Sequence, residues 1–306
     1  MTKSQCQGWA RLLILVTFLY TNSLSLGCFA AACCGGASAL PGLITGDYKY
    51  EFSTSFHMTA VLGTVVNTTN EVRTYWVEDP WQHPTQSLNL AGAYLFLSYW
   101  QVNLALPLMP TADRQMQLGD MTTALAYEFM PEREYGQWQP RGIAFFSLGW
   151  PTGPSLFKGD LNASSTSGLG TFVPAGGIWL QKIWGPYDAS LSGQWQQPLP
   201  LSGEEGTSQN FMPQLSLHIA AGYSPPWAPP LRLGARVGRV SQPHGTTPLG
   251  EPIPERGVSD LALTTSYMMD ESTSFTFTFS DQSLLDSARN TNLERTISLL
   301  MQKGYF

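Results

Sequence analysis

Four histidines and a small set of charged residues are the side chains of this sequence best suited to chemistry. His57, His83, His218 and His244 lie far apart, and none belongs to an H-E-x-x-H zinc motif. A G-x-S-x-G nucleophile motif is also missing from the sequence. We therefore expect no catalytic residue, no metal site and no cofactor, and we predict that the protein is not an enzyme.

A second group of polar residues recurs on one face of alternating segments, where it would line a polar interior. Residues on adjacent segments include His218, Arg232, Arg236 and Asp260, whose opposite charges could bind or filter a solute. The favoured alternative is that these charges pair with one another and hold the wall together. The candidate lumen residues are Lys49, Glu51, His57, Gln101, Asn103, Glu128, Asp188, Gln194, His218, Arg232, Arg236 and Asp260.

The elements that would position these residues are strands, because apolar and polar residues alternate along most of the chain. In 274–280, Phe275, Phe277 and Phe279 alternate with Ser and Thr. The pattern predicts twelve strands at 47–64, 85–97, 100–109, 118–130, 140–150, 170–184, 187–197, 212–223, 230–240, 258–268, 273–281 and 294–305. The segment 71–78 also alternates, and we interpret it as an extension of the first hairpin above the membrane.

The connections between these strands alternate in length. Long connections rich in Gly, Pro, Ser, Thr and Asn, such as 65–84 and 151–169, alternate with short ones, such as that at Gly185 and Pro186. Barrels of the outer membrane have short periplasmic turns and long external loops. An even number of strands then predicts that both ends of the barrel domain face the periplasm.

The composition supports a barrel over a soluble domain. Charged residues make up only 12% of the 306 residues, about half the usual share, while aromatic residues also reach 12%. The mean hydropathy is nevertheless close to neutral, at −0.09. We predict an all-β fold, a transmembrane antiparallel up-and-down β-barrel of about twelve strands in the lipid bilayer of the cell outer membrane. The net charge of −6 gives no basic patch for nucleic acid.

The N-terminus resembles an export signal. Lys3 and Arg11 provide positive charge, and the apolar run 12–20 has nine residues, far fewer than the ~20 of a spanning helix. We predict a signal peptide at 1–32 that is cleaved on export through the periplasm. Residues 33–46 would be a flexible tail or a lumen plug, and 47–306 the barrel. Lipidation of Cys33 or Cys28 stays open, although neither has a Leu three residues before it.

Tyrosines and tryptophans cluster at the strand ends assigned to the periplasm. Their rings have an apolar body and a polar tip, so they prefer a membrane interface. We expect such an interface girdle to contain Tyr48, Trp100, Tyr127, Trp184, Tyr187, Tyr223, Trp227, Tyr267 and Tyr305.

Several stretches resemble a family of outer-membrane channels of Gram-negative bacteria. They are SYWQVNLALPL (98–108), LGDMTTALAYEF (118–129), FFSLGWPTGPS (145–155) and GLGTFVPAGGIWLQKIWG (168–185). In order and spacing they are similar to the transporters linked to aromatic-hydrocarbon and phenol-degradation pathways, which are distantly FadL-like. The similarity covers roughly residues 85–200, and the remainder agrees only in architecture. The motifs at Gly119 and Asp120, and at 151–153, look structural.

The resemblance implies a channel for small, often hydrophobic solutes, without identifying the solute. It also implies that the last strand, which ends on Tyr305 and Phe306, is recognised by the barrel-assembly machinery. Two alternatives stay open. One is a non-conducting surface barrel whose external loops mediate contacts, and the other is a barrel-borne hydrolase that uses His218.

Overall fold

The computed structural model describes residues 42–44, 48–67, 71–110, 116–131, 138–154, 168–202, 208–209, 212–246, 252–285 and 288–306. The predicted signal peptide, all four cysteines and most of the segment 33–46 lie outside these residues. Within the described part of the chain, none of the helices is long and apolar enough to cross a membrane.

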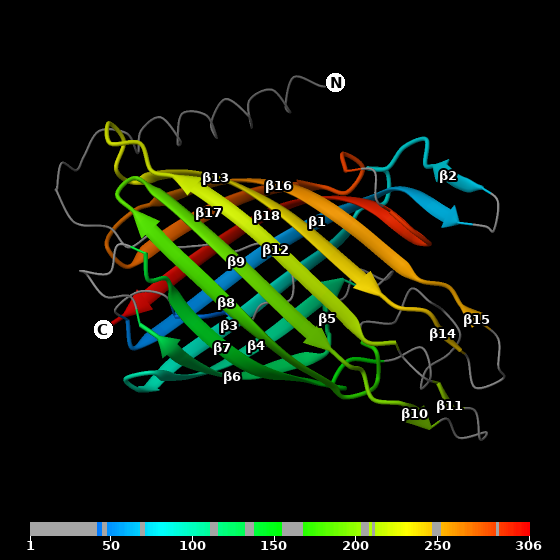
Figure 1. Cartoon of the computed structure of the whole chain (residues 1–306), viewed down its shortest axis with the longest axis horizontal. Helices are drawn as coiled ribbons and strands as arrows, with labels where there is room; N and C mark the ends of the chain where they lie inside the picture. The colour runs from blue at the N-terminus through cyan, green and yellow to red at the C-terminus, as the bar shows by residue number, and fades with distance from the viewer. Residues whose placement is uncertain are drawn as a thin grey trace.

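Twelve long antiparallel strands form a closed barrel (Figure 1), as the alternation predicts. Each strand pairs with its neighbour in the chain order, and β18 pairs with β1 from Tyr50↔Tyr305 to Val65↔Thr291, which closes the sheet. The strands are β1 (Tyr50–Asn67), β3 (Thr85–Leu97), β4 (Trp100–Pro110), β6 (Met121–Met130), β7 (Arg141–Trp150), β8 (Val173–Trp184), β9 (Tyr187–Gln196), β12 (Gln214–Tyr223), β13 (Leu231–Gln242), β16 (Arg256–Met268), β17 (Thr273–Asp281) and β18 (Thr291–Tyr305).

The short strands belong to the long connections and lie mainly at the end opposite the C-terminus (Figure 1). They are β2 (Val72–Trp76), β5 (Met116–Leu118), β10 (Leu201–Ser202), β11 (Ser208–Gln209), β14 (Gly245–Thr246) and β15 (Pro252–Ile253). β2 pairs with the far end of β1, between Gly63 and Asn67. The interpretation of 71–78 as an extension of the first hairpin is therefore confirmed.

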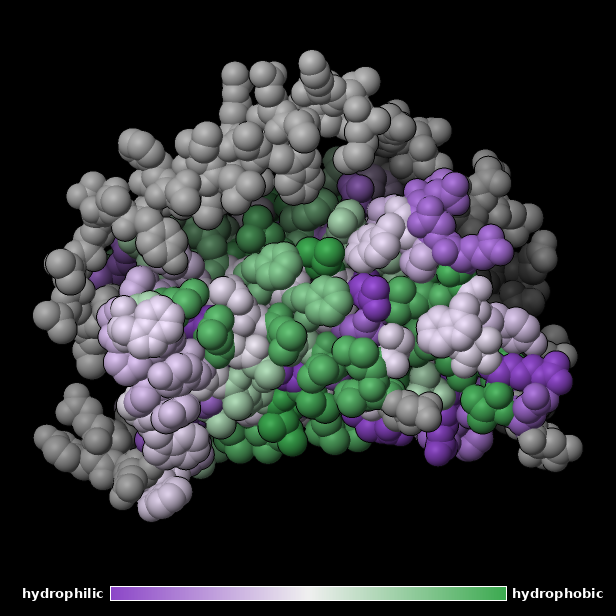
Figure 2. Space-filling view, turned by 90° about the horizontal axis from the view of Figure 1, so that it is seen from above, coloured by the Kyte–Doolittle hydropathy of each residue, from purple (hydrophilic) through white to green (hydrophobic). Residues whose placement is uncertain are grey.

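Most of the large apolar residues of the strands face outward. Ile219 is 65% exposed and Phe277 47% exposed, whereas Thr276 and Thr278, which alternate with Phe277, are buried. Figure 2 shows apolar side chains gathered across the middle of one face, with more hydrophilic residues towards its ends. This is the reverse of a water-soluble protein, because the polar side chains are in the interior.

Aromatic rings gather at the end of the barrel that carries the short turns. Trp100 packs on Tyr127 with ring centroids 4.7 Å apart, and Tyr187 packs on Tyr223 at 5.1 Å. Tyr48 contacts Phe306, and its hydroxyl donates to the backbone oxygen of Glu271. The remaining members of the predicted girdle, at the same end, are exposed: Trp184, Trp227, Tyr267 and Tyr305.

The predicted continuous strand 118–130 is wrong in one respect, because it breaks at Gly119 and Asp120 into β5 and β6. The Asp120 carboxylate accepts hydrogen bonds from the backbone N–H groups of Gly153, at 3.0 Å, and Leu169, at 2.6 Å. The Thr152 hydroxyl donates to the Gly119 carbonyl at 2.8 Å. The motifs at Gly119, Asp120 and 151–153 thus contact each other and hold three chain segments together at this rim.

Candidate lumen site

Eleven of the twelve candidate lumen residues lie in barrel strands and are buried or half-buried. The exception is Lys49, which precedes β1 and is exposed at the mouth of the barrel. Its backbone nevertheless continues the pairing of β1, because the Lys49 N–H donates to the Tyr305 carbonyl and the Lys49 carbonyl accepts from the Leu95 N–H, both at 2.8 Å.

The first ion pair of the wall joins two strands that are not neighbours. Arg232 on β13 donates from Nε and Nη2 to the two carboxylate oxygens of Asp188 on β9, at 2.7 and 2.6 Å. Both side chains are buried. The intervening strand β12 carries Gly222 at the crossing, where a methyl group would overlap both side chains. The ion pair can form across β12 because Gly222 has no side chain to separate Arg232 from Asp188.

A second cluster joins β12, β13 and β16, as the neighbouring strands predict. Arg236 donates to Asp260 at 2.8 Å, and His218 and Asp260 both approach the position that a Cβ of Gly238 would occupy. The structure therefore brings His218, Arg236 and Asp260 together and joins Arg236 to Asp260, whereas Arg232 pairs with Asp188 outside the expected group.

The hydrolase alternative requires a nucleophile beside His218 at one depth of the barrel. The strand register does place Ser192, His218 and Asp260 in one row across β9, β12, β13 and β16. Among the described residues, however, His218 Nδ1 has no hydrogen-bond partner and no hydrogen bond joins His218 to Ser192. The row thus lacks the hydrogen bonds by which a histidine activates a hydroxyl.

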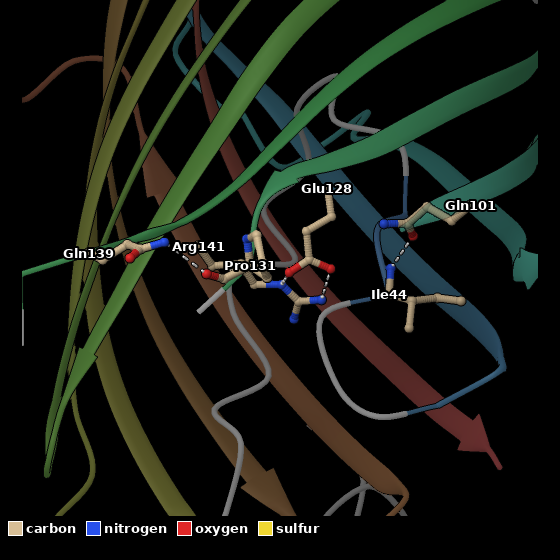
Figure 3. Close-up of polar contacts among 6 residues, drawn as sticks. All are labelled: Ile44, Gln101, Glu128, Pro131, Gln139 and Arg141. Carbon is tan, nitrogen blue, oxygen red and sulfur yellow. Dashed lines mark hydrogen bonds and ion pairs between the residues drawn. The ribbon is translucent and has the colours of Figure 1, made fainter. Parts of the chain in front are cut away.

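A third pair, shown in Figure 3, includes a residue that sequence reasoning missed. Arg141 at the start of β7 donates to both carboxylate oxygens of Glu128 on β6, at 2.8 and 2.9 Å. Beside it, Gln139 donates to the Pro131 carbonyl at 3.3 Å. The sequence feature that indicates an inward-facing Arg141 is its position, because it lies on the same face of β7 as the buried residues Ile143 and Phe145.

Next to this pair the wall is apolar, which the alternation of the strands does not predict. Ala126, Ile143, Phe145 and Trp179 form a buried cluster on β6, β7 and β8. Gly177 makes room for it, because a Cβ there would lie 2.5 Å from Phe145 Cζ. Strands that are apolar on both faces give no indication of which aromatic residues turn inward.

The N-terminal segment (residues 42–44) lies against these inward-facing residues. Leu43 packs on the apolar cluster, and Ile44 is 2% exposed. The Ile44 N–H donates to Gln101 Oε1 at 2.7 Å, and Asn103 Nδ2 donates to the Gly42 carbonyl at 2.8 Å (Figure 3 shows the first bond). Two of the candidate lumen amides therefore bind backbone of this segment.

The remaining wall, on β16, β17, β18 and β1, is rich in hydroxyl groups. Ser266 and Thr276 are 2.9 Å apart, as are Thr59 and Thr296. Glu51 accepts a hydrogen bond from Gln302 at 3.1 Å, and His57 Nε2 lies 2.8 Å from the Ser55 hydroxyl.

Gln194, on β9, is buried with its Oε1 unpaired. Within the described ranges, no group of three His, Cys, Asp or Glu residues could hold a metal ion.

Comparison with known proteins identifies the fold but not the family. No protein-family model matches the sequence, and no curated protein matches it. The structure is similar to an outer membrane channel from Pseudomonas putida F1, with a TM-score of 0.62 at 11% identity over 86% of this chain and 100% of that one. A toluene transporter of P. putida, TodX, gives 0.38 at 9% identity over 85% and 91% of the two chains. The NanC porin gives 0.47 at 8% identity over 83% and 100%. The likeness to the first of these shows that the chain has the β-barrel fold of an outer-membrane protein.

Proposed function

We propose that this protein is an outer-membrane channel that passes small solutes, including hydrophobic ones. The observation that carries the proposal is the inversion of the two faces: apolar side chains cover the outside, and polar side chains line a closed interior. A twelve-stranded barrel is intermediate between eight-stranded barrels, which side chains fill, and open porins of sixteen or more strands. We therefore propose a narrow passage.

The chemistry of the wall supports passage of small uncharged molecules over selection of one ion. Six of the lumen charges are compensated in three pairs, Asp188 with Arg232, Asp260 with Arg236 and Glu128 with Arg141, while Glu51 accepts a hydrogen bond from Gln302. The apolar cluster on β6, β7 and β8 would offer an apolar surface to a solute when Leu43 leaves it, and the hydroxyl-rich wall offers hydrogen bonds. A passage with both surfaces suits molecules with an apolar body.

The segment 33–46 would act as a plug in this proposal. The support comes from residues 42–44, whose backbone binds Gln101 and Asn103 and whose Leu43 covers the apolar cluster. A flexible periplasmic tail would not need these contacts. The signal peptide at 1–32, the periplasmic placement of the aromatic girdle and recognition of β18 by the assembly machinery complete the proposal.

Recording single channels in planar bilayers tests the function directly. The purified, folded full chain should give steady unitary conductance steps, and heat-denatured protein should give none. Barrels that are folded but give no steps would contradict the proposal. Folding is checked beforehand by whether the unheated protein migrates faster than the boiled one on a denaturing gel.

One observation favours the second candidate, a surface barrel whose external loops mediate contacts. The β2 extension exposes Val72, Tyr75 and Trp76, which are 62%, 57% and 63% exposed. Apolar side chains concentrated on a projecting hairpin are typical of contact surfaces. This candidate predicts folded barrels without conductance, so the same bilayer recording separates the two functions.

A further inference from the structure

A cavity of about 300 Å³ lies at the barrel end that carries the short turns. It is bounded by the β8–β9 turn at Gly185 and Pro186, by the β12–β13 connection 224–230, and by the end of β16 at Met268. Its volume is at the lower limit of pockets that hold small organic molecules. We call this cavity the vestibule.

The outer wall of the vestibule is apolar and rigid. It is lined by five prolines, at positions 186, 225, 226, 229 and 230. Their rings fix the backbone, and hydrogen bonds tie the connection 224–230 to the barrel: Ser224 N–H donates to the Pro186 carbonyl at 2.7 Å, and Met268 N–H to the Pro230 carbonyl at 2.9 Å. The cavity is therefore held open by the backbone and does not depend on flexible side chains.

The inner wall of the vestibule is polar but has little net charge. It is formed by the ion pair of Asp188 with Arg232 and by the Ser266 hydroxyl, and Ile183 lies beside the pair. An anion entering the vestibule would compete with Asp188 for Arg232, and a cation would compete with Arg232 for Asp188. Breaking a buried pair in this way is costly. A neutral hydrogen-bonding group could enter the vestibule without competing for Arg232 or for Asp188, so the ion pair would stay intact.

We propose that the vestibule is a binding site for a small neutral molecule with a compact apolar body and one hydroxyl group. The apolar body lies on the proline rings, and the hydroxyl group points towards Asp188, Arg232 and Ser266. The role of the vestibule as a station on the solute route rests on the proposed channel function. The binding itself depends only on the cavity.

A pair of matched fluorinated probes tests the charge preference. The folded full chain in detergent is titrated with 4-(trifluoromethyl)benzyl alcohol and, separately, with 4-(trifluoromethyl)benzoate, and binding is followed by fluorine NMR. The alcohol should give a saturable shift, and the benzoate should bind at least about tenfold more weakly. Equal binding of the two probes would overturn the proposed ligand class.

Substitutions at Ile183 locate the site. Ile183→Trp fills the vestibule and should abolish saturable binding of the alcohol, whereas Ile183→Leu preserves the volume and should retain it. Met268→Trp, from the opposite wall, serves as a second filling variant if Ile183→Trp does not fold. Unchanged binding in a folded filling variant would place the alcohol elsewhere and overturn the proposal.

Bilayer recordings of the same preparations separate this proposal from the channel function. Alcohol binding that is lost in the filling variant, in a protein without conductance, would support the vestibule and reject the channel. Steady conductance together with no saturable alcohol binding would reject the vestibule and leave the channel intact.

Discussion

Asp188 and Arg232 form a bidentate ion pair across an intervening strand, with donor–acceptor distances of 2.6 and 2.7 Å. Arginine and carboxylate match in this geometry, so the pair fixes the direction of both side chains. The space for it comes from Gly222, over which the two side chains meet. The missing side chain of Gly222 therefore leaves a notch in the wall, and the Asp188 carboxylate and the Arg232 guanidinium meet in this notch.

Gly222→Ala should destabilise the barrel by about 1–3 kcal/mol, because the added methyl group overlaps both members of the pair. The free energy of unfolding is measured by urea titration in detergent or lipid. Gly176→Ala is the matched control, since its Cβ would meet only the Phe145 carbonyl, at the ordinary distance of 3.8 Å. Equal stability of the two variants would show that the notch has no role.

The pair itself should show strong coupling. Asp188→Asn leaves Arg232 buried without a compensating charge, which costs about 3–5 kcal/mol. The double variant Asp188→Asn with Arg232→Gln should cost less than the single variant, because no charge then remains in the wall. A double-mutant cycle of unfolding free energies checks this. Additive effects would mean that the two residues stabilise the barrel independently.

Asp120 should stabilise the rim through its two backbone hydrogen bonds. In Asp120→Asn one carboxylate oxygen becomes an NH2 group, which faces a donor, so one of the two bonds from Gly153 and Leu169 is lost. The expected loss is about 1–3 kcal/mol in unfolding free energy. Asp79→Asn, at an exposed position, is the control and should be neutral. A neutral Asp120→Asn would contradict the tethering role.

The strands could be predicted closely because one face of each strand is in an apolar environment and the other faces the polar interior. Apolar and polar residues therefore alternate with a period of two along each strand. β17 is the clearest example, with Phe275, Phe277 and Phe279 alternating with buried threonines. The break at Gly119 and Asp120 could not be predicted, because its cause is a carboxylate that binds residues about thirty and fifty positions later.

The lumen was predictable in its polar residues and not in its apolar ones. Polar side chains such as Asp188 and Gln101 have only one favourable direction in a barrel, so their phase assigns them inward. Phe145 and Trp179 can pack favourably either on the outer face or in the interior, so the alternation does not predict which face they are on. The pairing of Asp188 with Arg232 also needed the register of three strands, which no local pattern contains.

Gln101 should hold the N-terminal segment in place. Gln101→Leu keeps the size of the side chain but removes the acceptor of the Ile44 N–H. We expect higher or more fluctuating single-channel conductance, because the segment is released from the wall. Gln194→Leu makes the same change in the same row of the sheet on β9 and should leave conductance unchanged. Identical recordings from the two variants would contradict the plug.

Ile219→Arg tests whether the apolar surface faces lipid. Ile219 lies in the middle of β12 and is 65% exposed, while Leu284, in the connection after β17, is 59% exposed. In a water-soluble protein, Arg at either position would be nearly neutral. In a bilayer, Arg at the mid-strand position should cost about 2–4 kcal/mol, and Arg in the aqueous loop should cost close to nothing.

The two variants are compared by their unfolding free energies in lipid vesicles, with Ile219→Leu as a third protein that should match the unmodified chain. The informative quantity is the difference in unfolding free energy between Ile219→Arg and Leu284→Arg, since both add the same charge to a similarly exposed apolar position. A clear penalty at Ile219 alone requires lipid around the strands. If both variants were as stable as the unmodified protein, the outward face would not be in a membrane, and the channel function would be excluded with it.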